Sequence, residues 1–478
     1  MFYLEQLPFY PYLCDSCNKC SEIHELLMDG HQKCKLPLDG IVGFHSIRFA
    51  TSNAKEMASY LEYSLDCKEI AYRGLETGSV MLASHVVKKN DCVFELINTL
   101  GRGDSRPGSK RSRPNTSSSR PGTARSAKAP VTLPVGGSDS TLHDIASAAA
   151  QLSQDAQDSS AVDEFVACHG MGVIDVSFEV VDVDAAFERA VFYGATNIRR
   201  PAVIGDEHGS VKLAVVGVPD SDLRHTLIQK LDYKGPYLPF YKSSWSLPMC
   251  QGGPVPISEI DHCVQNFSWN EMTIYATFYA SAFGLHKFWS VDEQDVSTGA
   301  TALKSIVMAS ANGKVKMPIN EPAKGRMKGQ IEEFYEFYNG PGVQHIALKS
   351  RDIVQSVKGM RSRGVEFNTI SDTYYNDLME RLTKNSIELF ESFKELRKYN
   401  ILVDFDPSTK YKSRDGKTRC HYILQIFTKP LHDRPTLFLE IIQRRHHNGF
   451  GKGTFKGLFE TIEAQQRLRG TLVPSALM

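Results

Sequence analysis

Two stretches of this sequence decide its fold: EIDHCVQNFSWNEMTIYATFYASAFGL (259–285) and GVQHIALKSRDIVQSVKGMRSRGV (342–365). Each begins with a short alternation of apolar and polar residues, which predicts a strand. Each continues through Asn, Asp or Ser, which favour the start of a helix, into apolar residues at helical spacing and a Gly that favours its end. His262 and His345 fall at the same place in the two predicted strands.

The same plan occurs twice more, in GFHSIRFATSNAKEMASYLEYSL (43–65) and GVIDVSFEVVDVDAAFERAVFYGA (172–195). Superposition of the four stretches places His45 and Asp175 level with His262 and His345. The interval from 45 to 175 approaches the later two once an insertion of roughly fifty residues is removed. Each unit therefore reads as one helix among several strands, and pairing the units two by two predicts two α+β domains, each with a curved sheet around a cavity.

The composition is that of an ordinary soluble protein. The 478 residues include 55 Lys and Arg against 55 Asp and Glu, with 41% hydrophobic residues, which excludes a fully disordered, collagenous or disulfide-scaffold chain. No apolar run approaches the ~18 residues of a membrane span, and the N-terminus lacks the basic start of a secretory signal. Ten cysteines are sparse and favour reduced thiols. We therefore predict a cytoplasmic protein without integral membrane association.

Two segments lie outside the repeated units. Residues 101–130 are almost entirely Gly, Ser, Thr, Pro, Arg and Lys, and a small, polar stretch follows, so we predict a disordered insertion over 101–160. Within it, LHDIASAAAQLSQDAQ (142–157) leaves a transient helix as an alternative. A solvated loop is the simplest interpretation, and we predict no nucleic-acid partner, although the basic cluster leaves an interaction open. Residues 1–40 are predicted to be an irregular extension. Cys14, Cys17, Cys20 and Cys34 within it leave zinc or an iron–sulfur cluster as an alternative.

Three residues of the second half suggest a metal site. Pairing of the third and fourth units brings His262 and His345 to one locus, and Glu440 interrupts the apolar strand PTLFLEIIQR (435–444). A carboxylate among apolar neighbours is costly unless it is paired or bound to a metal. Two His and one carboxylate form the facial triad of non-haem Fe(II) oxygenases. At the matching place of the first half we assign His45, Asp175 and Gln229, and because Gln is a weak ligand we expect that half to be metal-free.

Several longer motifs carry a family resemblance. EIDHCVQN, GVQHIALK, LQIFTKP (424–430), RPTLFLEIIQR and GFGKGTFKGLFETIEAQQRLRG (449–470) resemble the 4-hydroxyphenylpyruvate dioxygenase family of the vicinal-oxygen-chelate superfamily. The resemblance covers about 41–100 and 165–474. It implies four βαβββ modules paired into two open-barrel domains. These are a structural N-terminal domain at 41–245, a catalytic C-terminal domain at 256–448 and a C-terminal lid helix at 449–474.

The resemblance also implies the reaction. A family member converts 4-hydroxyphenylpyruvate and O2 to homogentisate and CO2, a step of tyrosine and phenylalanine catabolism. The resemblance implies that Fe(II) is the cofactor and that His262, His345 and Glu440 of this chain are its ligands. Because the substrate is itself an α-keto acid, no separate 2-oxoglutarate is needed. The family further implies a homodimer in the cytoplasm.

The resemblance extends to a substrate pocket of uncharged polar and aromatic side chains. Amide and hydroxyl groups orient a keto acid and a phenol without competing for iron, and aromatic walls hold the ring. Phe450 and Phe455 belong to the lid that excludes water. The pocket residues implied are Ser305, Asn320, Gln330, Gln344, Gln425, Phe427, Phe438, Phe450 and Phe455.

The chain departs from the family pattern at three places. Thr454 stands where Asn is usual, Gln265 replaces a Gly, and residues 407–422 lengthen a hairpin. These differences keep two alternatives open. One is 4-hydroxymandelate synthase, which uses the same substrate and iron. The other is a non-catalytic binding protein that has kept the fold, although the second half has lost no ligand.

Overall fold

The computed structural model describes residues 40–101, 142–244, 252–291, 297–451 and 453–475. The cysteines of the N-terminal segment and residues 102–141 of the predicted insertion lie outside the described residues. In the first half the elements are β1 (Ile41–Ala50), α2 (Ala54–Leu65), β2 (Lys68–Arg73), the 3-10 helix η2 (Leu75–Thr77), β3 (Leu82–Lys89), β4 (Cys92–Thr99), α3 (Leu142–His169), β5 (Gly172–Val180), α4 (Val183–Phe192), β6 (Thr196–Asp206), β7 (Gly209–Gly217), β8 (Arg224–Lys230) and β9 (Lys242–Ser243).

The second half repeats the pattern with longer connections. Its elements are β10 (Ile257–Asn266), α5 (Met272–Phe283), β11 (His286–Val291), β12 (Ala302–Ala309), β13 (Lys316–Ala323), α6 (Gln330–Tyr338), β14 (Gly342–Ser350), α7 (Ile353–Ser362), α8 (Asp372–Lys384), α9 (Phe393–Tyr399), β15 (Leu402–Lys412), β16 (Thr418–Phe427), β17 (Phe438–Arg445) and α10 (Phe455–Arg469).

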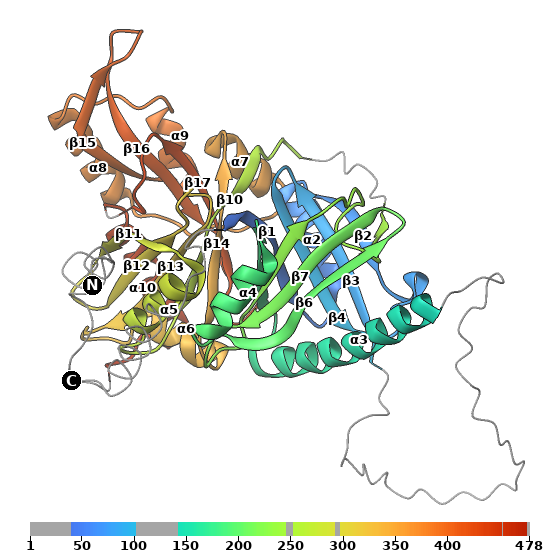
Figure 1. Cartoon of the computed structure of the whole chain (residues 1–478). Coiled ribbons are helices and arrows are strands. Elements are labelled where there is room, and N and C mark those ends of the chain that lie inside the picture. The colour runs from blue at the N-terminus through green and yellow to red at the C-terminus, as the bar shows by residue number, and fades with distance from the viewer. Residues whose placement is uncertain (1–39, 102–141, 245–251, 292–296, 452, 476–478) are drawn as a thin grey trace, which may run out of the picture.

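Each half forms one curled sheet (Figure 1). The first sheet has the strand order β6-β7-β8-β5-β1-β4-β3-β2-β9, and the second has the order β11-β12-β13-β10-β14-β17-β16-β15. The first strands of paired modules run antiparallel at the centre of each sheet, β1 beside β5 and β10 beside β14. Each of these strands also pairs in parallel with the last strand of its own module. The predicted fold of four βαβββ modules is therefore confirmed.

The first helix of most modules begins where the sequence pattern places it. Asn53, Asp182 and Asp352 precede α2, α4 and α7, and the side chain of each accepts a hydrogen bond from a backbone N–H of the first turn. Gly284 ends α5 with a positive φ of 68°, a conformation that glycine adopts without strain. These local signals set where the helices begin and end.

One apolar core joins the two halves. It contains residues of β1, β5, β10, β14 and of the helices packed against them. Helix α4 lies against α5 between the sheets, and Phe178 of β5 meets Phe283 of α5 with ring centroids 5.9 Å apart. A hydrogen-bonded pair also crosses this contact, because His225 Nε2 lies 2.9 Å from the hydroxyl of Tyr279. This shared core holds the second sheet, which carries the metal-site residues, against the first half.

The last part of the predicted disordered insertion is helical, which corrects that prediction. Helix α3 runs along the outside of the first sheet (Figure 1). Asp155 on this helix is buried and accepts hydrogen bonds of 2.5 and 2.6 Å from Arg73. At its end, His169 stacks on Tyr338 of α6 with ring centroids 4.3 Å apart. The Ser/Asp-rich composition suggested disorder, but Val162 and Phe165 further along give the helix an apolar face to bury.

None of the helices in the described part of the chain combines the length and the apolar character needed to cross a membrane.

Candidate metal centre

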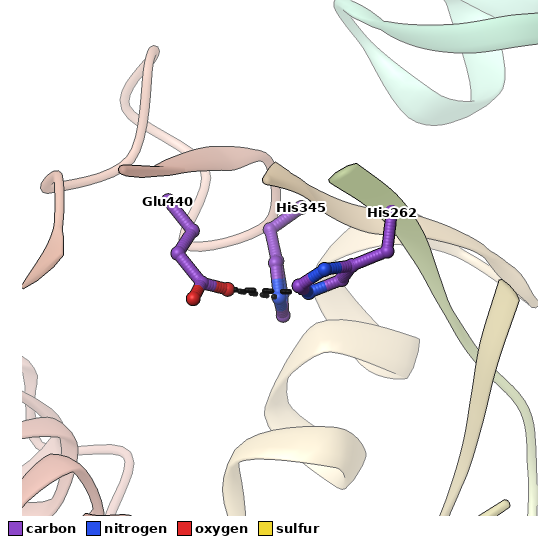
Figure 2. A group of neighbouring side chains, drawn as sticks. All are labelled: His262, His345 and Glu440. Atoms are coloured by element: carbon purple, nitrogen blue, oxygen red, sulfur yellow. Dashed lines mark ion pairs between the residues drawn. The ribbon is translucent and has the colours of Figure 1, made fainter. Parts of the chain in front are cut away.

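Three adjacent strands at the middle of the second sheet bring the predicted ligands together. In the ladder, His262 of β10 lies opposite Ala347 of β14, and Ala347 lies opposite Glu440 of β17. His345 is two residues before Ala347, so its side chain emerges on the same face. Glu440 Oε2 lies 3.3 Å from His262 Nε2 and 3.4 Å from His345 Nε2, as the dashed lines of Figure 2 show.

Each ligand has a second partner that fixes its orientation. Asp261 Oδ1 accepts a hydrogen bond of 2.8 Å from His262 Nδ1, and Gln344 Oε1 lies 3.0 Å from His345 Nδ1. Because these oxygens are acceptors, Nδ1 carries the proton in both rings and Nε2 faces Glu440. Gln425 Nε2 donates to the other oxygen of Glu440 over 2.9 Å. Such partners hold ligand rings in place and raise their basicity.

The site is buried and strongly polarised. Burial by itself raises the pKa of Glu440, but hydrogen bonding and electrostatic interaction with the two His rings outweigh burial and lower it to about 2. Burial lowers the pKa of His262, whereas hydrogen bonds with Asp261 and Glu440 raise it to a net value above the ordinary one. The pKa of His345 is lowered, mainly by burial. Glu440 is therefore an anion at neutral pH, with His262 the imidazole that retains its proton longest.

The three side chains fit a divalent transition metal. Their potential ligand atoms lie within 4.8 Å of one another, and this is the only group of three or more His, Cys, Asp or Glu with that property among the described residues. Two imidazoles and one carboxylate suit iron and similar metals, and a triad on one face leaves coordination positions for other molecules.

Metal affinity is expected to fall as the pH is lowered. The metal needs both imidazoles neutral, and the raised pKa of His262 means that a proton competes for this ring from a higher pH than for an ordinary His. Glu440, with a pKa of about 2, stays ionised throughout. Calorimetric titration with Co(II) in two buffers of different ionisation enthalpy should show proton release on binding. Affinity that is independent of pH and releases no proton would contradict this electrostatic account.

Beside the triad is a cavity of about 60 Å3 that five of the predicted pocket residues line. Its lining residues come from strands β10 to β14, β16 and β17 and from the chain that leads into α10. Phe450 covers it, with its ring centroid 5.0 Å from that of His262 and 5.5 Å from that of Trp289. The predicted residues on its wall, besides the three ligands, are Ser305, Asn320, Gln425, Phe427 and Phe450.

The other predicted pocket residues lie farther back. Phe438 stacks on His345 with ring centroids 4.8 Å apart, so it supports a ligand. Gln344 touches His345 from behind and donates to Gln330 Oε1 over 3.3 Å. Phe455 is the first residue of α10, and its side chain lies outside the described part of the structure. The substrate roles of all these residues stay predictions.

Sequence reasoning missed two groups of residues at the site. Trp289, Val264, Val307 and Leu458 line the cavity, but apolar residues in strands and helices give no signal that separates a pocket from a core. Asp261 and Arg444 form a buried ion pair behind His262, with nitrogen and oxygen 2.7 Å apart. Arg444 holds the pKa of Asp261 well below its ordinary value, although burial alone would raise it. The sequence offered one signal for this pair, because the charged residue Asp261 directly precedes the predicted ligand His262.

The alignment of the first half needs a correction of register. Both ladders are irregular at this point, between Phe44 and Ser46 in β1 and between Ile260 and His262 in β10, and the matching registers put Ser46, not His45, at the place of His262. Likewise Thr226, not Gln229, stands where Glu440 stands, because Asp175 pairs with Arg224 and Phe178 with Leu227. Gln229 instead accepts a hydrogen bond from the backbone of Val183 at the start of α4. Alignment of the repeats on their His residues therefore places β1 one residue out of register.

At this place the first half holds an ion-pair network. Arg48 Nε donates to Glu95 Oε2 over 2.7 Å, and Glu95 is fully buried. Three hydroxyl groups also donate to Glu95, those of Ser84, Tyr237 and Tyr241, at 2.7, 2.9 and 2.5 Å. Burial raises the pKa of the Glu95 carboxyl, but the charge of Arg48 and these hydrogen bonds hold it below its ordinary value. The network fills the inner face with protein groups.

Two of the departures from the family pattern are also placed. Gln265 points away from the cavity and donates to the hydroxyl of Tyr279 over 2.8 Å, which joins it to the hydrogen-bonded contact between the two halves. The lengthened hairpin is formed by β15 and β16 and projects from the second sheet (Figure 1). Neither difference alters the triad.

Comparison with known proteins agrees with this geometry. Residues 259–392 match the family described as Glyoxalase/Bleomycin resistance protein/Dioxygenase superfamily. The chain is 40% identical over 437 residues to 4-hydroxyphenylpyruvate dioxygenase of Aspergillus fumigatus, covering 90% of this chain and 94% of the relative. It is 41% identical over 435 residues to the enzyme of that name from Neurospora crassa, covering 90% and 93%. A triple mutant of 4-hydroxymandelate synthase from Streptomyces coelicolor superimposes with a TM-score of 0.64 at 26% identity, covering 89% of this chain and 99% of the other.

Proposed function

The chain belongs to the 4-hydroxyphenylpyruvate dioxygenase family, and we propose that it converts 4-hydroxyphenylpyruvate and O2 to homogentisate and CO2 with Fe(II). The observation that carries the proposal is the buried group of His262, His345 and Glu440, with potential ligand atoms within 4.8 Å of one another. The reaction balances without a further oxidant. The keto acid loses CO2, and the two atoms of O2 enter the new carboxylate and the ring.

The three ligands would hold Fe(II) from one side. When bound, Fe(II) supplies a chelation site for an α-keto acid and the chemistry that activates dioxygen. The chain contributes the fixed ring orientations, through Asp261 and Gln344, and a carboxylate that stays ionised. These features keep the ligands preorganised, so little reorganisation is needed when the metal binds.

The cavity wall offers the groups that would orient the substrate. Ser305 and Asn320 are paired across β12 and β13, and Gln425 lies beside Glu440 on the neighbouring strand. Their hydroxyl and amide groups suit the phenol and the keto acid because each both donates and accepts hydrogen bonds. The rings of Phe427 and Phe438 form an edge-to-face pair, with their planes at 76° and their centroids 6.1 Å apart. Such rings suit contact with the aromatic ring of the substrate.

The small size of the cavity supports a lid that is closed over the site. A cavity of about 60 Å3 is far smaller than the ~300–1,000 Å3 of ordinary small-molecule sites. Phe450 therefore has to withdraw for the aromatic keto acid to enter. With substrate bound, its return would exclude water from the reacting centre.

Replacing Phe450 with alanine is expected to uncouple the reaction. Water would reach the metal, so more dioxygen would be consumed for each homogentisate formed, and kcat would fall about tenfold. An oxygen electrode measures the dioxygen consumed and chromatography the homogentisate formed, and the two measurements on the same samples give the ratio of dioxygen to homogentisate. The control is Phe192→Ala, an exposed phenylalanine of α4. A ratio unchanged from that of the native protein would contradict the proposed role of Phe450.

A product assay tests the proposed function directly. The purified chain with Fe(II), ascorbate, O2 and 4-hydroxyphenylpyruvate should release CO2 and form homogentisate, identified by chromatography. Formation of 4-hydroxymandelate would select the synthase reaction, and binding of substrate without turnover would select a non-catalytic protein.

The finer expectations of assembly, domain limits and location rest on the family. We propose a homodimer, which light scattering of the purified chain tests, and a cytoplasmic location, which fluorescence microscopy of a tagged chain tests. We further propose a structural domain at 41–245, a catalytic domain at 256–448 and the lid helix. In support, the strands of the first sheet lie within 41–243 and those of the second within 257–445.

A further inference from the structure

Arg444 connects a metal ligand with the chain that leads to the lid. Its Nε and Nη2 atoms donate to both oxygens of Asp261 at 2.8 and 2.7 Å, and Asp261 holds His262. Its Nη1 atom donates to the backbone carbonyl oxygens of Gly449, at 2.6 Å, and His447, at 3.1 Å. The planar guanidinium presents donors in fixed directions, so one side chain fixes both groups at once.

The same guanidinium supports the residue that covers the cavity. Arg444 Cζ lies 5.1 Å from the centroid of the Phe450 ring, and that ring lies against His262. The side chain of Arg444 is 10% exposed. Arg444 therefore contacts both Asp261, the partner of the ligand His262, and the ring of Phe450. Withdrawal of Phe450 would take away a partner of Arg444.

A second connection runs from the lid to Glu440. The hydroxyl of Thr454, just before α10, lies 3.0 Å from Gln425 Oε1 and 2.7 Å from the carbonyl oxygen of Gly451. With Oε1 facing Thr454, the amide of Gln425 presents Nε2 to Glu440 at 2.9 Å. Gly451 approaches so closely that a Cβ atom there would lie 2.1 Å from Gln425 Oε1. The closed lid thus also orients the partner of a second ligand.

We propose that closure of the lid and ordering of the metal ligands are linked through Arg444 and Thr454, which act as positioning residues. Arg444 transmits the state of Gly449 and Phe450 to His262, and Thr454 transmits it to Glu440. The inference rests on the proposed metal centre but not on the identity of the reaction. Because linkage is reciprocal, metal binding favours the closed lid by the same factor by which the closed lid favours metal binding.

The first experiment measures Co(II) affinity by calorimetry on the full chain. Arg444→Met should lower the affinity by about 10–100-fold, the usual effect of losing an outer partner of a ligand. Arg444→Lys keeps the positive charge but not the planar guanidinium with its several donors. Its Co(II) affinity should lie between those of Arg444→Met and the native chain. The matched control is Arg445→Met. Arg445 is the next residue of the same strand and pairs with Glu391 at 2.8 Å instead. Its loss should leave Co(II) affinity unchanged.

The second experiment separates linkage from a merely structural role. Phe459 of α10 packs in an apolar cluster with Val291, Leu303 and Ile331. Phe459→Leu should loosen the lid and lower Co(II) affinity about fivefold in the native chain, at the low end of allosteric coupling. When Phe459→Leu is added to the double variant Arg444→Met, Thr454→Val, it should not change the Co(II) affinity further. Thr454→Ser, which keeps the hydroxyl, should behave like the native chain.

Hydrogen exchange of α10 provides a readout of the lid itself. Co(II) should slow exchange of the α10 amides in the native chain and in Arg445→Met, but not in the Arg444→Met, Thr454→Val chain. Equal effects of Phe459→Leu in both backgrounds, or equal Co(II) affinities of Arg444→Met and Arg445→Met, would overturn the linkage while leaving the metal centre intact. Failure of the native chain to bind Co(II) would overturn both.

Discussion

Glu440→Ala is expected to abolish turnover and to lower Fe(II) affinity by more than about 100-fold, the upper range for loss of an outer partner, because a ligand itself is removed. Glu440 supplies the only negative charge among the three ligands and lies within 3.4 Å of both imidazoles. Without it, two neutral rings face the metal, and the two remaining ligands no longer define one face of its coordination sphere. Anaerobic Fe(II) titration and the homogentisate assay measure the two effects separately.

Two further variants sharpen this prediction. Glu440→Gln keeps the shape of the side chain but not its charge, so it should bind metal only weakly. Glu366→Ala removes an exposed carboxylate that pairs with Lys429, and it should leave metal binding and turnover as they are. Normal Fe(II) binding by Glu440→Ala would show that the ligand set is wrong, whatever reaction the chain performs.

The second large effect concerns stability and lies in the other sheet. Glu95→Ala is expected to lower the free energy of unfolding by about 3–5 kcal/mol, because it leaves the guanidinium of Arg48 without its partner. It also removes the acceptor of three buried hydroxyl groups, two of them those of Tyr237 and Tyr241. Urea unfolding of the metal-free chain, followed by circular dichroism, measures the loss.

A paired substitution distinguishes this explanation from general damage to the core. Arg48→Met combined with Glu95→Leu replaces the ion pair by apolar side chains, and it should restore the part of the stability that Glu95→Ala loses through the unpaired Arg48. If the double variant were as unstable as the single one, the cost would come from packing and from the hydroxyl groups that lose their acceptor. The metal centre lies in the second sheet, so the double variant should keep its Co(II) affinity.

The regular features of the fold follow from the sequence. The alternating residues around His262 and His345, the helix-start residues Asn53 and Asp352 and the end of α5 at Gly284 are local signals, and each was placed correctly. The repeat then predicted the pairing of modules. Glu440 joined the two His as a candidate ligand because a carboxylate is costly in an apolar strand.

What the sequence could not predict depends on contacts between distant residues. His45 stands at the place of Asp261 and not of His262, and only the pairing of β1 with β5 reveals this register. Arg444 reads as an ordinary charged residue at the end of a strand until β17 is placed near β10 and Asp261. Asp155 reads as part of a disordered segment until Arg73 is brought beside it. Such contacts are set by tertiary packing, which overrides local composition.

Isotope labelling of the product tests the central claim most directly. The native chain with Fe(II) and 4-hydroxyphenylpyruvate is allowed to turn over under 18O2, and the product is analysed by mass spectrometry. The account predicts homogentisate that contains both labelled atoms, one in the carboxylate and one on the ring, and the same product absent from Glu440→Ala. Labelled 4-hydroxymandelate, or no labelled product from the Fe(II)-loaded native chain, would contradict it.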